Sequence, residues 1–166
     1  DHSRGPRYLE HFPGHSWIQA HFPEGDSLAL YQMWQVVDGV EKEALSEATI
    51  YKDGKFHEAK VIYSPRMLST SNIVCDYQLI VESDLGRWEL TGKPQGLAFF
   101  SYGTLMSHFT PSVPTGINEF FMTNVEQPTI FTCNGRRAVG HTERSYPRLE
   151  AEKVFDGELL KKAYGR

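Results

Sequence analysis

Apolar residues occupy every second position in several short stretches of the chain. The clearest is residues 73–82, where Ile73, Tyr77 and Val81 belong to an apolar series whose alternate neighbours are mostly polar. Successive side chains of a strand face opposite ways, so this alternation predicts a strand with one buried face. The same reasoning predicts about nine or ten strands, at 15–22, 27–37, 43–51, 56–63, 73–82, 87–91, 97–102, 118–125, 129–133 and 137–145.

Turn residues separate these strands at intervals of about 8–12 positions, which is typical of an antiparallel barrel or sandwich. Asp38-Gly39, Asp53-Gly54 and Asn134-Gly135 have the chemistry of tight hairpins. Gln127-Pro128 is expected to separate two strands, and a short helix capped by Asp156 is expected near the C-terminus. The predicted fold class is therefore all-β: an antiparallel barrel or strongly curved sandwich with at most one short C-terminal helix.

Length and charge narrow the class of protein. The chain has 166 residues, which suits a single domain with a sizeable core. A net charge of -4 and a pI of about 6.0 give no basic surface for nucleic acid. The chain has no run of about 18 apolar residues that would span a membrane, and its charged start is unlike a signal peptide. A cytoplasmic location is favoured.

Because the sequence begins without methionine, we expect a processed product or a piece of a longer protein.

The two cysteines, Cys75 and Cys133, lie in strand-like stretches. They could form a disulfide, but two buried thiols are the simpler interpretation. The sequence has no Cys/His spacing typical of zinc, no Gly-x-Ser-x-Gly nucleophile elbow, no phosphate loop and no dinucleotide fingerprint. It therefore predicts neither a cofactor nor a metal.

Residues 15–22 form the most informative predicted strand, because polar and aromatic side chains share one of its faces. Trp17, Gln19 and His21 lie on that face, while the other face is apolar. Two interpretations are open: the mixed face lines a polar cavity that holds a ligand, or Gln19 and His21 simply face water. Tyr31 and Trp34, in the next predicted strand, are likewise either ligand contacts or core residues.

Both ends of the chain resemble motifs of one superfamily. Residues 1–7, Asp-His-Ser-Arg-Gly-Pro-Arg, resemble the motif Asp-His-Ser-Trp-Gly-x-Arg. Residues 135–143 resemble the closing pattern Gly-x-x-x-x-Gly-x-x-Glu, with Glu143 in its last position. Both motifs are those of the lipocalin-like superfamily that includes carotenoid 1,2-hydratases, kievitone hydratases and AttH-like proteins. Arg4 departs from the motif, because an arginine does not supply the flat apolar wall of the motif tryptophan.

This resemblance implies that residues 1–166 form one lipocalin-like (calycin-type) barrel, the C-terminal domain of a longer two-domain protein. It also implies two partners: an N-terminal domain of the same protein, and an apolar small molecule such as an isoprenoid, a polyketide or an aromatic compound. If the protein is an enzyme, the resemblance implies a lyase of the hydratase type or an isomerase that acts on an unsaturated substrate.

Adding water to a carbon–carbon double bond needs a proton donor and a base, and side chains take these roles when burial tunes their pKa. The candidate catalytic residues are Asp1, His2, His21 and Glu143. The candidate ligand-binding residues are Arg7, Trp17, Gln19, Tyr31 and Trp34. The competing interpretations are a hydrogen bond between Asp1 and His2 that fixes a turn, and an ion pair between Glu143 and an arginine.

Strand alternation also predicts how the candidate residues are oriented. Glu143 and His141 should share one face of their strand, and Arg144 should take the other. We expect Glu143, and not Arg144, to face the barrel interior together with Trp17 and His21. The opening motif is expected near the closing strand, because the first and last strands of a barrel pair with each other.

Three functions remain open from the sequence. The domain could be part of an enzyme that adds water to, isomerises or cyclises an apolar molecule. It could be a lipocalin-type binding module without chemistry, or a structural domain that packs on an N-terminal partner. The interior of the barrel should discriminate between them, because a solid core excludes both the enzyme and the binding module, whereas a cavity with two or more converging ionisable groups favours the enzyme.

Overall fold

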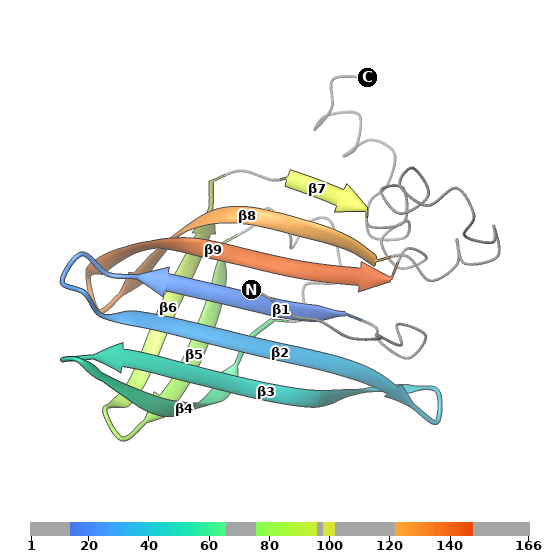
Figure 1. The fold of residues 1–166 in the computed structure, drawn as a ribbon, viewed down its shortest axis with the longest axis horizontal. Coiled ribbons are helices and arrows are strands. Elements are labelled where there is room, and N and C mark those ends of the chain that lie inside the picture. Colours follow the sequence, from blue (N-terminus) through green and yellow to red (C-terminus); the bar gives the residue numbers. More distant parts are fainter. Residues whose placement is uncertain (1–13, 66–75, 96–97, 102–121, 148–166) are drawn as a thin grey trace.

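Nine antiparallel strands make up the part of the chain that the computed structural model describes, which is residues 14–65, 76–95, 98–101 and 122–147 (Figure 1). The strands are β1 (His15–His21), β2 (Ser27–Val37), β3 (Val40–Lys52), β4 (Lys55–Tyr63), β5 (Tyr77–Ser83), β6 (Gly86–Pro94), β7 (Ala98–Ser101), β8 (Met122–Cys133) and β9 (Arg136–Pro147). The described residues contain no helix, so none of them forms a helix that could cross a membrane. The predicted C-terminal helix lies outside the described residues.

The strands close into a barrel. Their order is β6-β5-β4-β3-β2-β1-β9-β8-β7, and β6 also pairs with β8. This extra pairing joins the two ends of an eight-stranded sheet, and β7 is added beside the first half of β8. The first and last strands, β1 and β9, pair along the whole of β1, from His15 with Ser145 to His21 with Val139. The all-β antiparallel barrel predicted from the sequence is therefore confirmed.

The predicted hairpin signals are tight turns in the structure. Asp38-Gly39, Asp53-Gly54 and Asn134-Gly135 all have positive φ at both residues, between 50° and 78°. This conformation matches the twist of the flanking strands, and Asp, Asn and Gly adopt it at low cost. These three pairs connect β2 to β3, β3 to β4 and β8 to β9, so they set the register of five of the strands.

The prediction that Gln127-Pro128 separates two strands is wrong, because β8 runs without interruption from Met122 to Cys133. Pro128 lies where the neighbour of β8 changes from β7, which ends at the pair Ala98–Glu126, to β6, which begins at the pair Pro94–Thr129. Its carbonyl accepts a hydrogen bond of 2.8 Å from the backbone N–H of Gln95 on that side. The missing N–H of proline thus falls in a gap between ladders, where no partner strand needs it.

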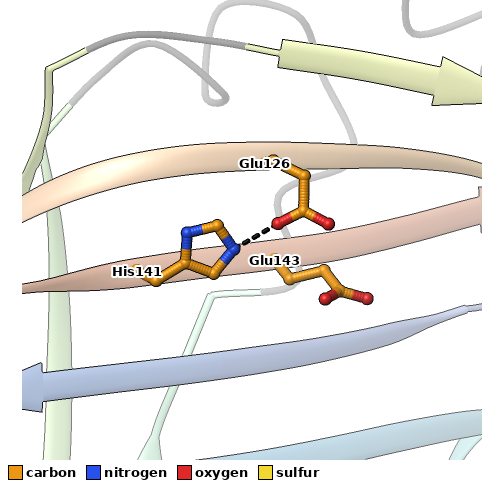
Figure 2. A group of neighbouring side chains, drawn as sticks. All are labelled: Glu126, His141 and Glu143. Atoms are coloured by element: carbon orange, nitrogen blue, oxygen red, sulfur yellow. Dashed lines mark hydrogen bonds and ion pairs between the residues drawn. The ribbon is translucent and has the colours of Figure 1, made fainter. Parts of the chain in front are cut away.

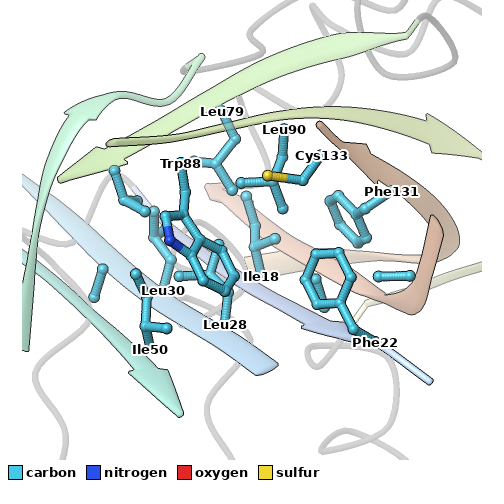
Figure 3. Close-up of a cluster of buried hydrophobic side chains, with 14 of the residues drawn as sticks. Ile18, Phe22, Leu28, Leu30, Ile50, Leu79, Trp88, Leu90, Phe131 and Cys133 are labelled. Atoms are coloured by element: carbon cyan, nitrogen blue, oxygen red, sulfur yellow. The ribbon is translucent and has the colours of Figure 1, made fainter. Parts of the chain in front are cut away.

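An apolar core fills one half of the barrel interior (Figure 3). Ile18 and Ala20 from β1, and Phe22 just after it, all point into this core, and the Phe22 ring meets Trp88 edge-on at 5.8 Å. The remaining buried members are Leu28, Leu30, Ala48, Ile50, Tyr77, Leu79, Val81, Leu90, Phe131, Cys133 and Ala138. Cys133 is a buried free thiol, as predicted, and Cys75 lies outside the described residues.

A charged cluster covers the apolar end of the barrel. Asp26 accepts hydrogen bonds from Arg136 (2.7 Å) and Lys52 (3.2 Å). Arg136 also contacts Glu24 at 3.3 Å and lies over the Phe22 ring, 4.5 Å from its centroid. These contacts join the β1–β2 turn to the hairpins between β3 and β4 and between β8 and β9. The ion pairs of this cluster therefore hold the three loops in place over the core.

We expect Asp26→Asn to lower the free energy of unfolding by about 2 kcal/mol near pH 7, because Asp26 is buried and charge-assisted hydrogen bonds are lost. Burial raises the pKa of Asp26, but the bonds from Arg136 and Lys52 outweigh it and hold the pKa below 3.8. A lowered pKa in the folded state contributes stability above the unfolded pKa, and this stability is lost as the pH falls through the folded pKa.

The difference between the wild type and Asp26→Asn should therefore shrink below about pH 4. Urea unfolding at pH 7 and at pH 3 measures it. Glu24→Gln is the control, because Glu24 contacts the same arginine from an exposed position and its replacement should leave the free energy of unfolding almost unchanged. An equally large loss of unfolding free energy in Asp26→Asn at both pH values would contradict a lowered pKa of Asp26 in the folded state.

Candidate functional site

Ionisable side chains converge on the outer face of β1, β9 and β8. Glu143 lies directly opposite Trp17 on β1 and opposite Glu126 on β8, and His141 lies opposite Gln19. Partners in an antiparallel pair project to the same face, so these side chains lie together outside the barrel. The prediction that Glu143 and His141 share one strand face is therefore confirmed.

The prediction that this face is the interior is wrong. Ile18 and Ala20 take the interior face of β1 and lie opposite Thr142 and Gly140. The interior face of β9 therefore also carries Arg144, which is only 1% exposed. The apolar face of β1 is therefore the inner one, and Gln19 and His21 lie on the outer face, as in the second of the two interpretations of this strand.

His15 holds Glu143 in a defined orientation. Its Nε2 lies 2.7 Å from Oε1 of Glu143, and its Nδ1 lies 2.7 Å from Oγ of Ser145. Ser145 Oγ also accepts a hydrogen bond of 3.0 Å from the backbone N–H of His15. The serine hydroxyl is then free to donate to Nδ1, which leaves the proton of a neutral imidazole on Nε2, where it points at the carboxylate.

Glu126 and His141 form the second half of the cluster (Figure 2). Nε2 of His141 contacts Oε2 of Glu126 in a hydrogen bond or ion pair. The ligand atoms of Glu126, His141 and Glu143 all lie within 4.8 Å of one another. The two carboxyl groups, one from each of two paired strands, are thus close enough to influence each other's protonation.

The surroundings shift the pKa values of the two carboxyl groups in opposite directions. The hydrogen bond from His15 lowers the pKa of Glu143 below its usual 4.5, against the opposing effect of burial. Burial raises the pKa of Glu126 above 4.5, and repulsion by the Glu143 carboxylate raises it further, while His141 only partly offsets this. At a pH between the two values, Glu143 is ionised and Glu126 carries a proton.

Aromatic rings lie next to the carboxyl pair on the same face. Tyr31 on β2 stacks on the His15 ring at 5.4 Å with an interplanar angle of 28°. The Trp17 ring meets Tyr31 edge-on at 6.4 Å. Both rings come from positions opposite each other in the β1–β2 pair, so their location follows from the register. The result is a half-buried apolar surface beside two ionisable groups.

The structure brings only some of the predicted site residues together. Trp17, Gln19 and Tyr31 lie on the outer face with Glu143. His21 is exposed at the far end of the same face of β1, and Trp34 is buried. The remaining predicted residues, Asp1, His2 and Arg7, lie outside the described residues.

Sequence reasoning missed His15 and Glu126 as members of the site. His15 could have been found, because it precedes Trp17 by two positions and so shares its face. Glu126 could not, because its place opposite Glu143 depends on the register of β8. The donor set of one imidazole and two carboxylates also suits a divalent cation. The spacing of residues along a single strand did not indicate this donor set. Here, however, Glu143 and Glu126 are each already paired with a histidine.

Neither a protein-family model nor a curated protein sequence matches the chain. Its structure is similar to the crystal structure of an AttH-like protein from Nitrosomonas europaea, with a TM-score of 0.51 and 17% sequence identity over a match that covers 86% of this chain. It is also similar to kievitone hydratase from Nectria haematococca, with a TM-score of 0.40, 12% identity and 81% coverage.

The likeness to the AttH-like protein shows that the chain has the same barrel fold, which is the fold that its end motifs predicted. The chain spans 42% of the length of the AttH-like protein and 40% of the length of kievitone hydratase.

Proposed function

We propose that the chain is the acid–base domain of a hydratase- or isomerase-like protein that acts on an unsaturated, apolar small molecule. The observation that carries this proposal is the pair formed by Glu126 and Glu143, whose pKa values are shifted in opposite directions. Two neighbouring carboxyl groups with separated pKa values are the usual arrangement of a proton donor beside a base.

Each group has one role in the proposed reaction. The Glu126 carboxyl gives its proton to one alkene carbon, and the double-bond electrons form the new C–H bond. In a hydration, water attacks the carbocation at the other carbon and the Glu143 carboxylate takes the proton of that water. In an isomerisation, Glu143 takes a proton from the neighbouring carbon and a new double bond forms. Proton exchange with solvent then returns both groups to their starting states.

The geometry also favours one stereochemical course. Glu126 and Glu143 project from the same sheet face, with ligand atoms within 4.8 Å. They would therefore approach a flat alkene from one side, which favours syn addition of water or a suprafacial proton shift. The rings of Trp17 and Tyr31 would support the apolar part of the substrate on that side.

The rest of the substrate site is proposed to come from an N-terminal domain of the same protein. The chain spans 42% of the AttH-like protein, which leaves room for such a domain in a protein of that length. The end of β4 supports this proposal, because the neighbouring apolar side chains of Ile62 and Tyr63 are exposed there.

The alternative of a lipocalin-type module that holds its ligand in the apolar half of the barrel has less support. Leu30, Leu79 and Leu90 fill that half with side chains that are at most 1% exposed. The sequence criterion for an enzyme assumed that ionisable groups would converge inside the barrel. They converge outside it, so a packed core is compatible with the proposed chemistry.

The test is incubation of the protein in deuterium oxide with a panel of prenylated aromatic compounds and isoprenoid alkenes, followed by mass spectrometry. Acid–base chemistry at the alkene places one deuterium on carbon in each turnover, for hydration and isomerisation alike. Retention of the starting mass by every compound, in a protein that is folded by circular dichroism, would count against the proposal.

We expect the turnover rate to follow a bell-shaped pH profile. The rate should rise as Glu143 ionises, below pH 4.5, and fall as Glu126 loses its proton, above pH 4.5, because the pKa values of the two groups lie on either side of that value. The groups that face the pair are His15 from β1 and His141 from β9. Glu126→Gln should lower the rate and remove the falling limb, whereas an unchanged falling limb in this variant would assign that limb to another group.

A further inference from the structure

The barrel interior has a polar end opposite its apolar core. Arg144, Ser16, Gln32 and Ser46 lie side by side across β9, β1, β2 and β3, because each is the register partner of the next. All four lie on the interior faces of their strands. Ser16, Gln32 and Ser46 are each two positions from a core residue, and Arg144 is two positions from the fully buried Thr142. Arg144, Ser16 and Gln32 are each at most 3% exposed. Buried polar side chains in a barrel interior need hydrogen-bond partners.

Arg144 is held in place on one side only. Its Nη1 donates a hydrogen bond of 3.1 Å to Oε1 of Gln127. Its Cζ lies 4.9 Å from the centroid of the Tyr77 ring, over the ring face. The Tyr77 hydroxyl is itself fixed by Thr142, 2.5 Å away, and Thr129 contacts the same threonine. The guanidinium plane therefore has a defined orientation within the barrel.

The other edge of the guanidinium has no acceptor among the described residues. Nε and Nη2 of Arg144 are both buried and form no hydrogen bond there, and the same holds for Oε1 of Gln32. An unpaired charge in the interior is costly, so such a group is normally paired. Nε–H and Nη2–H form the parallel fork of donors that binds the two oxygens of one carboxylate.

We propose that the polar end of the barrel interior binds a small carboxylate, with both carboxylate oxygens on the Nε–Nη2 edge of Arg144. The site is distinct from the outer-face carboxyl pair, since Arg144 and Glu143 are consecutive residues on opposite faces of β9. The packed core limits the ligand to a short molecule, or to one that extends out of the polar end. The carboxylate comes from a free small molecule, and an acidic side chain of another protein segment is the competing source.

The experiment is an NMR titration of the 15N-labelled protein with propionate, in a buffer without other carboxylates. The Nε–H signal of Arg144 is assigned by its absence in Arg144→Lys. We expect saturable shifts of this signal with propionate and none with the isosteric, neutral propionamide. Arg144→Met should weaken propionate binding at least tenfold, as measured by calorimetry. Arg137→Met, a control on the same strand at an exposed position, should bind like the wild type.

Two further results make the test decisive. Arg144→Met should unfold at the same or a higher temperature, because it removes an unpaired buried charge. If this variant does not fold, Arg144→Lys takes its place, and it should bind propionate more weakly because lysine lacks the fork. Equal binding by the wild type and the Arg144 variants, or no binding by the wild type, would overturn the proposal. So would a crystal structure with a water or an acidic side chain of the protein on the Nε–Nη2 edge.

Discussion

Gly140→Ala should lower the free energy of unfolding by more than about 3 kcal/mol, or leave the protein insoluble. Gly140 lies opposite Ala20 in the pairing between β1 and β9. An added Cβ would overlap the backbone carbonyl oxygen of Gln19 and lie 2.8 Å from its carbonyl carbon. Backbone atoms in a paired strand cannot rotate away as a side chain can, so the two strands would have to separate. Since a closed barrel needs this pairing as well as that of β6 with β8, the loss would extend to the whole fold.

Gly135→Ala is the matched control for this experiment. Gly135 has a φ of +76° in the β8–β9 turn, but an added Cβ would meet nothing within 4 Å. Its replacement should cost only about 1 kcal/mol, the cost of placing alanine in a conformation that favours glycine. Urea unfolding followed by circular dichroism compares the variants. Equal stability of the two would mean that β1 and β9 lie farther apart than described.

Glu143→Gln should lower turnover of the proposed reaction about 100-fold to 10,000-fold and leave the fold intact. The amide keeps the size of the side chain, and its oxygen still accepts a hydrogen bond from His15, which lies 2.7 Å away in the wild type. It cannot take a proton from water or carbon. Deuterium incorporation measures the rate, and thermal unfolding checks the fold.

Glu82→Gln is the control, because Glu82 is an exposed carboxylate on β5 and should have no effect on turnover. Turnover by Glu143→Gln within threefold of the wild type would show that Glu143 takes no part in the chemistry. A large drop in unfolding temperature would instead assign Glu143 a structural role, as the ion-pair partner of His15.

The sequence predicted the strands and turns well because both depend on local chemistry. Asp53-Gly54 and Asn134-Gly135 form the turns that their preference for positive φ predicts. The apolar series from Tyr77 to Val81 alternates between buried and less buried positions, as expected for β5. The error at Pro128 arose because local chemistry does not say which neighbour a strand has. A proline is tolerated in β8 only because two different strands meet β8 there.

The candidate site was harder to predict, because it depends on which side of the sheet is inside. The alternation placed Glu143 and Arg144 on opposite faces correctly, yet the prediction took the mixed polar and aromatic face of residues 15–22 as the lining of the interior. The apolar series of Ile18 and Ala20 was the better guide, since a continuous core fixes the interior face of β1 and, through its register, that of β9. The contact between Glu126 and Glu143 requires that register and could not be read from either strand alone.

Closure of the barrel also determines when the site can form during synthesis. His15 and Glu143 are separated by 128 positions, and they meet only where β9 pairs with β1. Apart from this pairing and that of β6 with β8, every strand pairs only with a strand next to it in sequence. A nascent chain can therefore build β1 to β6 as successive hairpins while it leaves the ribosome. The acid–base pair assembles only after β9 has emerged, so a ribosome stalled before β9 would hold a largely paired sheet that has no site.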